Sequence, residues 1–246
     1  MLYMFLKTWV VAPVVTVLFR PTVVGAHYVP DSGPAILASN HLASSDHIFM
    51  PIAVKRQIFF LAKSEYFTGQ GVMGKIVAWF FRAINQIPMD RSGGTRSAAA
   101  LSAGVDTLAK GHLLGIYPEG TRSPDGRLYR AKLGVARLAL ESGAPVIPIA
   151  MIGTDVVQPV GRLFPAPWRQ KKGMRVTTVF GEPLDFSHLR HQAEEQQVVR
   201  HVADRILRAI QELSGQEYVD SYAADVKRAA SRNRSALGVW GSVENT

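Results

Sequence analysis

The sequence predicts an α/β fold, in which a central mixed, mostly parallel sheet of about seven strands is flanked by helices. Short runs rich in Val, Ile and Leu recur along the chain, and most of them do not alternate between apolar and polar residues. Such runs are typical of strands covered on both faces. Amphipathic helical patterns separate them, which favours parallel strands between helical layers. A length of 246 residues suits one such domain with a full core.

Each predicted element has its own local signal. The predicted strands are Thr22–Gly25, Ala35–Ser39, Ile58–Ala62, Ala83–Pro88, Leu113–Tyr117, Val146–Ile152 and Arg175–Phe180. A helix over Thr95–Lys110 is expected to end at Gly111, and one over Leu133–Ser142 at Gly143, because glycine favours the left-handed conformation that closes a helix. A third helix is predicted over His191–Leu213 from its apolar stripe.

Residues 1–20 predict a helix that associates with a membrane. Twelve uncharged residues lie between Lys7 and Arg20. As a helix they would span ~18 Å, whereas a hydrocarbon core needs ~30 Å. Pro13 is also expected to kink the helix near its middle. A helix lying in the membrane interface is therefore favoured over a helix that crosses it.

The interface model assigns a direction to each large side chain. Phe5, Trp9 and Phe19 are expected to insert into lipid, and Lys7 and Arg20 to face lipid phosphates. One alternative is a helix that packs on the protein's own core. Another is a signal peptide cleaved near the small residues Val24, Gly25 and Ala26, although the proline and the strand-like sequence that follows argue against it.

Composition narrows the classes of function. The chain has 28 Lys and Arg against 19 Asp and Glu, a net charge of +9 and no cysteine. The missing cysteine excludes disulfides, a thiolate nucleophile and cysteine-based metal sites. With 47% apolar residues and a mean hydropathy of +0.06, the chain is too mixed for a multi-span membrane protein. The positive charge favours nucleic acid, a membrane surface or phosphorylated substrates as partners.

Two further basic segments complete the organisation. We divide the chain into the N-terminal helix 1–20, a main domain 21–222 and a basic, flexible tail 223–246. The stretch 161–175 has five basic residues and no acid, with Phe164 and Trp168 among them. It is interpreted either as a solvated loop or as a second contact for a membrane or an anionic ligand.

The segment Ser39–Asp46 carries the clearest chemistry. It follows a buried strand and opens a short helix that Pro51 limits. A histidine that acts as a base needs one ring nitrogen free and the other held by an acceptor. Asp46 lies five residues after His41 and can turn back to be that acceptor, as in a serine protease triad without the serine. The substrate's own hydroxyl would then be the nucleophile.

Three more blocks accompany this motif. They are Pro88-Met89-Asp90-Arg91, Tyr117-Pro118-Glu119-Gly120-Thr121-Arg122-Ser123 and Val146-Ile147-Pro148-Ile149. In this order and spacing the four blocks resemble the glycerolipid acyltransferases, specifically the 1-acylglycerol-3-phosphate acyltransferase family. The resemblance covers about residues 20–185. Tyr117 stands where Phe is commoner in the family and Met89 where Ile or Val is usual, and neither is expected to touch the chemistry.

The resemblance implies an activity. It implies transfer of a fatty acyl group from acyl-CoA or acyl carrier protein to the free hydroxyl of lysophosphatidic acid, giving phosphatidic acid. His41 would deprotonate that hydroxyl, which attacks the thioester directly, and Asp46 would orient His41. The resemblance implies neither a resident cofactor nor a metal. It places the enzyme peripherally on the cytoplasmic face of the cell membrane, without nucleic acid as a partner.

The resemblance also implies the substrate sites. The acceptor phosphate and glycerol would be bound by Arg91, Glu119, Gly120, Thr121 and Arg122, and Pro148 would lie on the acyl-donor side. Guanidinium groups at strand ends suit a dianionic phosphate. Gly120 would let a backbone amide approach the ligand. Glu119 either orders Arg122 or binds a glycerol hydroxyl. Lys63 and Lys132 either add charge to this site or are plain surface lysines.

Other signals favour different classes of protein. Gly69–Gly74 matches a Gly-x-Gly-x-x-Gly pattern, but it does not directly follow a strand as a dinucleotide site requires. The apolar helix predicted over Val72–Phe81 is either core or the wall of an acyl-chain tunnel. His188 and His191 are expected at the surface. Two alternatives stay open: an acyltransferase for another lysophospholipid or a glycolipid, and a non-catalytic protein that binds lipid or nucleic acid.

Overall fold

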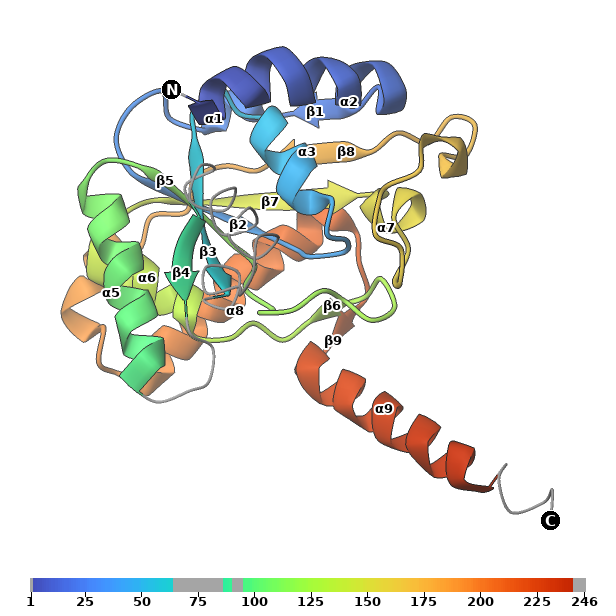
Figure 1. Ribbon diagram of the computed structural model, residues 1–246. Coiled ribbons are helices and arrows are strands. Elements are labelled where there is room, and N and C mark those ends of the chain that lie inside the picture. Colours follow the sequence, from blue (N-terminus) through green and yellow to red (C-terminus); the bar gives the residue numbers. More distant parts are fainter. Residues whose placement is uncertain (1, 64–85, 90–94, 241–246) are drawn as a thin grey trace, which may run out of the picture.

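The computed structural model describes residues 2–63, 86–89 and 95–240. A seven-stranded sheet forms its centre (Figure 1). In sheet order its strands are β1 (Thr22–Val24), β8 (Thr177–Phe180), β7 (Val146–Ile152), β2 (Ala35–Ser39), β5 (Leu113–Ile116), β3 (Ile58–Lys63) and β4 (Gln86–Met89). Only the β7–β8 pair is antiparallel within this described sheet. The predicted mixed, mostly parallel sheet is therefore confirmed.

Helices cover both faces of the sheet. The helices of the described residues are α1 (Leu2–Phe5), α2 (Ala12–Phe19), α3 (Asp46–Ile52), α5 (Thr95–Ala109), α6 (Gly134–Ser142), α7 (Thr154–Val157), α8 (Gln196–Ser214) and α9 (Ala223–Trp240), of which α9 extends away from the sheet (Figure 1). Ile36 and Ala38 of β2 face a core formed with α5, α6 and α8, whereas Ala35 and Leu37 face a second core formed with α2 and α3. This alternation explains why the strand reads as one continuous apolar run.

Glycines end the predicted helices as expected. Gly143 closes α6 with a φ of 67°, and its amide bonds to the Ala139 carbonyl. Gly111 adopts a φ of 77° just after α5. The helix predicted from His191 starts later, because residues 187–192 form a 3-10 helix and α8 begins at Gln196. A small sheet of β6 (Leu128–Tyr129) and β9 (Tyr218–Val219) was not predicted.

The N-terminal helix differs from its prediction in detail. It is regular over α1, becomes a π-helix over Leu6–Val11 and returns to α-helix at Ala12. The Ala12 amide bonds to the Lys7 carbonyl, and Pro13 next to it has no amide hydrogen. The proline therefore coincides with a change of helical winding. Within the described residues, no helix combines the length and the apolar character that crossing a bilayer requires.

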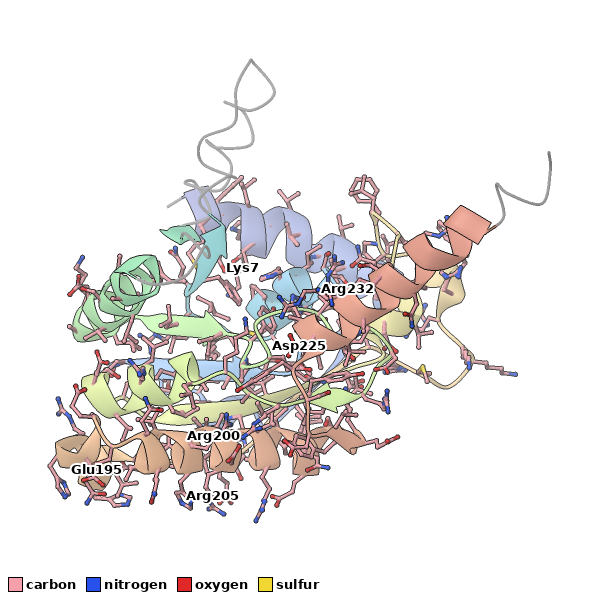
Figure 2. The ribbon with its side chains drawn as sticks, turned by 90° about the horizontal axis from the view of Figure 1, so that it is seen from below. Lys7, Glu195, Arg200, Arg205, Asp225 and Arg232 are labelled. Carbon is pink, nitrogen blue, oxygen red and sulfur yellow. The ribbon has the colours of Figure 1, made fainter. Side chains whose placement is uncertain are left out.

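Two side chains of this helix point the opposite way from the prediction. Phe5 and Trp9 are exposed as expected, but Phe19 is buried against Phe49 of α3, with the two rings edge to face. Lys7 is also buried, and its ammonium group donates to the carbonyls of Val54, Lys55 and Arg56 just beyond α3 (Figure 2). The predicted contact between Lys7 and lipid phosphate is thus wrong, because three carbonyls of the turn that follows α3 accept hydrogen bonds from its ammonium group.

The segment after residue 222, for which we predict a basic, flexible tail, has regular secondary structure in its described part. Its described part forms α9, which extends away from the sheet (Figure 1). Alanines favour helix here, and Arg228 pairs with Asp225 one turn before it. Ala223 is buried, whereas residues 228–233 are exposed. The predicted solvation of these residues is found, but on a helix.

Replacing Lys7 by Met tests the hydrogen bonds between its ammonium group and the turn that follows α3. The variant leaves buried carbonyls without their donor, and we expect it to lower the free energy of unfolding by about 1–3 kcal/mol. Lys55→Met, at an exposed position of the same region, is the control and should change it by less than about 0.5 kcal/mol. Urea unfolding measures both. Equal values for the two variants would contradict a stabilising role for the buried ammonium group.

Candidate active site

The pair of His41 and Asp46 lies where β2 ends and α3 begins. The Nδ1 atom of His41 is 2.8 Å from Oδ2 of Asp46. The same oxygen accepts the amide hydrogens of Leu42 at 2.8 Å and Ala43 at 3.0 Å. An ionised carboxylate only accepts, so Nδ1 carries the hydrogen and Nε2 has a free lone pair. This geometry gives His41 the tautomer that a general base needs.

The two members of this pair differ in solvent exposure. The Asp46 side chain is fully buried, whereas 12% of the His41 side chain is exposed. A buried carboxylate is stable only when hydrogen bonds replace its lost hydration. Three donors satisfy Oδ2 and close the turn between β2 and α3, whereas Oδ1 is buried without a hydrogen-bond partner among the described residues. The partly exposed imidazole can then meet a ligand from outside.

The end of β2 is tied to the neighbouring strand β7. The side-chain amide of Asn40 donates to the Met151 carbonyl at 3.0 Å, and its oxygen accepts the Met151 amide at 2.7 Å. It also donates to Oε1 of Gln216 at 2.7 Å. This reciprocal pair holds the residue before His41 in place where the backbone pairing of β2 and β7 ends.

Aromatic rings enclose the imidazole of His41. The Tyr117 ring stacks on it, with 3.9 Å between centroids and 16° between planes, and the His47 ring meets it edge-on at 5.4 Å. Burial, and then the charge of Asp46, raise the pKa of the Tyr117 phenol well above its ordinary value, so it stays neutral. We expected Tyr117 to be remote from the chemistry. That prediction was wrong, because Tyr117 packs directly on the candidate base.

Glu119 follows β5, the strand beside β2, and is 99% buried (1% exposed). Its two oxygens accept the amide hydrogens of His41 at 3.2 Å and Tyr129 at 3.0 Å. Next in this loop, the Ser123 amide donates to the His41 carbonyl at 2.7 Å. The loop after β5 therefore holds the backbone of His41 from both sides. This positioning contact was not predicted, and acceptor binding by Glu119 stays a prediction.

Arg122 of this loop and Lys227 of α9 form what we call the basic rim, beside Ser44 and Thr121. Nη1 of the exposed Arg122 donates to Oγ of Ser44 at 2.9 Å. From α9, Lys227 donates to Oγ1 of Thr121 at 3.0 Å and to the Arg122 carbonyl. A lysine from a segment that we predicted to be a flexible tail thus reaches the motif. No local pattern around Lys227 could have indicated this contact, which depends on where α9 starts.

Gly120 is needed for a reason other than the one predicted. Its φ is 72°, and a Cβ here would come within 2.9 Å of the Lys132 side chain. Its amide already bonds to the Tyr117 carbonyl at 2.9 Å, so that hydrogen closes the turn. Gly120 therefore serves the turn itself, and its predicted part in acceptor binding stays a prediction. Lys132 lies beside the motif, since its amide donates to the Pro118 carbonyl at 2.8 Å, and both interpretations of its charge stay open.

Three predicted site residues are not among the described residues that contact His41 or the loop after β5. Arg91 lies outside the described residues, as do Gly69–Gly74 and Val72–Phe81. Lys63 is the last residue of β3 and pairs with Met89 of β4. It lies at the carboxyl-terminal end of the parallel strands, the end at which His41 follows β2. Pro148 is buried inside β7 opposite Ala38, and its carbonyl accepts the Gly181 amide at 2.8 Å.

Gln158 links α3 to the chain beyond α7. The side chain is 3% exposed, and its Oε1 accepts the Ser45 amide at 2.6 Å. Its Nε2 donates to the carbonyls of Arg162 at 3.2 Å and Leu163 at 2.9 Å. One buried side chain therefore connects the residue before Asp46 to the basic stretch 161–175. Among the described residues, no group of three or more His, Asp or Glu side chains is placed to hold a metal ion.

Comparisons with known proteins place the chain in a family. A family model described as Acyltransferase matches residues 20–152. A chloroplast 1-acyl-sn-glycerol-3-phosphate acyltransferase from Arabidopsis thaliana is 29% identical over 144 residues, which are 58% of this chain and 39% of that protein. The alpha form from Homo sapiens is 30% identical over 133 residues, which are 54% of this chain and 45% of that protein. The chain thus spans less than half the length of these relatives.

A solved structure shares the fold. The crystal structure of the 1-acyl-sn-glycerophosphate acyltransferase PlsC from Thermotoga maritima superposes with a TM-score of 0.62. The match covers 86% of this chain and 79% of that chain, at 24% sequence identity. The architecture described above therefore occurs in a protein of known structure.

Titration of Glu119 should make stability depend on pH. Burial is the largest cause that raises the pKa of this carboxyl to about 7, from 4.5 in an unfolded chain. The folded protein therefore binds more protons than the unfolded chain between these values, and stability falls as the pH rises from about 4.5 to 7. We expect a loss on the order of 2 kcal/mol over this range.

Glu119→Gln removes this titration. The variant is less stable than the wild type at pH 5, because an amide cannot accept with both of its terminal atoms. Its stability should change less between pH 5 and 7 than that of the wild type. Urea unfolding at several pH values measures the difference. Parallel pH curves for the two proteins would show that Glu119 is already ionised at pH 5.

Proposed function

The chain belongs to the Acyltransferase family, and we propose that it is an O-acyltransferase acting on 1-acyl-sn-glycerol 3-phosphate. It would transfer a fatty acyl group from acyl-CoA or acyl carrier protein to the free hydroxyl, giving phosphatidic acid. The observation that carries this proposal is the His41–Asp46 pair, with Nδ1 held at 2.8 Å and Nε2 left as an acceptor. The names of the relatives from Arabidopsis thaliana and Homo sapiens support the choice of acceptor.

The proposed reaction is one direct transfer. Nε2 of His41 takes the proton of the acceptor hydroxyl, and that oxygen attacks the carbonyl carbon of the thioester. A carbon–oxygen bond forms, the carbon–sulfur bond breaks, and the leaving thiolate takes the proton from His41. Asp46 stabilises the imidazolium between these steps. No acyl-enzyme is needed, which suits a chain that contains no cysteine.

The acceptor phosphate is proposed to bind at the basic rim. Arg122 is exposed beside Ser44, and Lys227 lies against Thr121. Guanidinium and ammonium donors bind a dianionic phosphate strongly when they surround it. Arg91 belongs to this proposal through the resemblance of its motif, and Lys63 through its position at the end of β3. Pro148 belongs to it on the acyl-donor side through the resemblance of its own motif.

The enzyme is further proposed to work on a membrane surface, peripherally on its cytoplasmic face. Phe5, Trp9 and Val17 are among the exposed apolar side chains of the N-terminal helix. Arg20 at the end of this helix is exposed as well. Such a helix suits the interface of a bilayer, in which the lysolipid acceptor lies.

Acyl transfer from labelled thioesters to a panel of acceptors tests the whole proposal. The panel contains lysophosphatidic acid, other lysophospholipids and a glycolipid, each offered acyl-CoA and acyl carrier protein in turn. Lysophosphatidic acid is expected to be the best acceptor. Preferred transfer to a different acceptor would keep the chemistry and overturn the choice of substrate, and the absence of transfer to any acceptor would overturn the reaction.

His41→Ala tests the proposed base. We expect kcat to fall by roughly 10²–10⁴-fold, the usual contribution of general acid–base catalysis. His188→Ala, at an exposed position after β8, should leave turnover unchanged. Thermal unfolding by circular dichroism shows whether each variant is folded. A folded His41→Ala variant with near-normal kcat would rule out the mechanism.

Arg122→Ala tests the phosphate site. Loss of one charged donor should raise KM for lysophosphatidic acid about tenfold or more, with a smaller change in kcat. Arg137→Ala, at an exposed position on α6, is the matched control. Steady-state kinetics at saturating acyl donor measure both constants. An unchanged acceptor KM would place the phosphate elsewhere.

A further inference from the structure

The segment between α7 and β8 carries an unusual set of exposed side chains. Four large apolar residues are almost free of protein contact: Val160 is 73% exposed, Leu163 79%, Phe164 75% and Trp168 83%. Leu163, Phe164 and Trp168 line one surface hollow and so form one local patch, and Val160 lies three residues before it in the chain. Contiguous apolar patches on a protein surface mark interaction sites, whereas single exposed apolar residues do not.

Hydrogen bonds hold this segment in its outward conformation. The buried Gln158 donates to the carbonyls of Arg162 and Leu163. The Ala166 amide donates to the Val157 carbonyl at 2.8 Å. The backbone is therefore fixed at both ends of the Leu163-Phe164 pair, and the apolar side chains point away from it.

The charge around the patch has one sign. Residues 161–175 include five basic side chains and no acidic one, and all five are exposed: Arg162, Arg169, Lys171, Lys172 and Arg175. An apolar centre with a basic border matches the interface of an anionic bilayer, where apolar groups enter the acyl region and cations meet phosphates. A protein partner would need acidic groups around an apolar pocket, whereas a bilayer offers both without a special shape.

This segment adjoins the N-terminal helix. A surface hollow is lined on one side by Leu18, Phe19 and Arg20 and on the other by residues of 167–175. Figure 1 shows the segment extending from the body beside the end of α2. The exposed apolar stripe of the N-terminal helix and the patch at 160–168 thus lie on neighbouring parts of the surface.

We propose that residues 160–175 form a second membrane-docking element, which inserts Leu163, Phe164 and Trp168 into an anionic bilayer while its basic residues bind lipid phosphates. The proposal rests on the proposed function only in that a lysolipid acceptor lies in a membrane. Together with the N-terminal helix this element gives two points of attachment. Two such points fix the orientation of the enzyme on the surface, which one helix alone does not.

Vesicle binding tests the apolar part of the element. The whole chain is mixed with phosphatidylcholine vesicles that contain or lack phosphatidylglycerol, without acyl donor or acceptor, and bound protein is separated by flotation. Replacing Leu163, Phe164 and Trp168 together by Ser should lower the partition coefficient to anionic vesicles about tenfold or more. Tyr218→Ser, at an exposed aromatic residue of β9, is the control and should bind as the wild type does.

A charge variant tests the basic border. Lys171→Gln with Lys172→Gln should weaken binding to anionic vesicles, and added salt should remove the difference from the wild type. Arg205→Gln with Arg208→Gln is the control, because these arginines are exposed on α8, on the side of the molecule opposite to the N-terminal helix (Figure 2). Equal losses for both pairs would mean that net charge alone acts, and would overturn the assignment of this border.

Two outcomes separate this proposal from its alternatives. Unchanged vesicle binding by a folded triple-serine variant would overturn it. If wild-type dimers are then seen by sedimentation and the variant loses them, the patch is an interface between two copies of the chain. Acyl transfer to lysophosphatidic acid in detergent micelles reports separately on the proposed function, and there the triple-serine variant should be as active as the wild type.

Discussion

One oxygen of the buried Asp46 carboxylate accepts three hydrogens, from the imidazole of His41 and from two amides of the same turn. A fully buried charge requires such donors, so the chain between β2 and α3 has to close around it. The loop after β5 then attaches to the backbone of His41 through Glu119 and Ser123. The histidine motif and the glutamate motif are thus two parts of one hydrogen-bonded unit.

The sequence predicted the elements that hydrophobic periodicity and glycine positions define. All seven strands of the main sheet lie within a few residues of their predicted ranges, and β2 and β7, which are buried almost throughout, leave the clearest apolar runs. The proximity of His41 and Asp46 was also predictable, since a five-residue spacing within one turn leaves few arrangements. Contacts between remote segments were not predictable. Tyr117 on His41 and Lys227 on Thr121 depend on tertiary packing, which no local pattern encodes.

The basic residues of the chain have different structural roles. Lys7 is used inside the protein, at the end of α3, and its burial lowers its pKa to about 8. Lys227 serves the loop after β5, whereas the basic residues of 161–175 face outward. In the sequence these lysines and arginines look alike. Only the position of each side chain shows that Lys7 binds carbonyls of a turn, that Lys227 binds the loop after β5 and that the basic residues of 161–175 lie at the surface.

Gln158 connects the outward segment to α3 through a single side chain, with the Ser45 amide on one side and the carbonyls of Arg162 and Leu163 on the other. The connection consists of the hydrogen bonds of this one buried side chain. If residues 160–175 rest on a bilayer as proposed, the distance from the lipid headgroups to His41 is then a fixed dimension of the protein. The imidazole would stand at a constant height above the membrane, and the acceptor lipid would have to rise to that height to react.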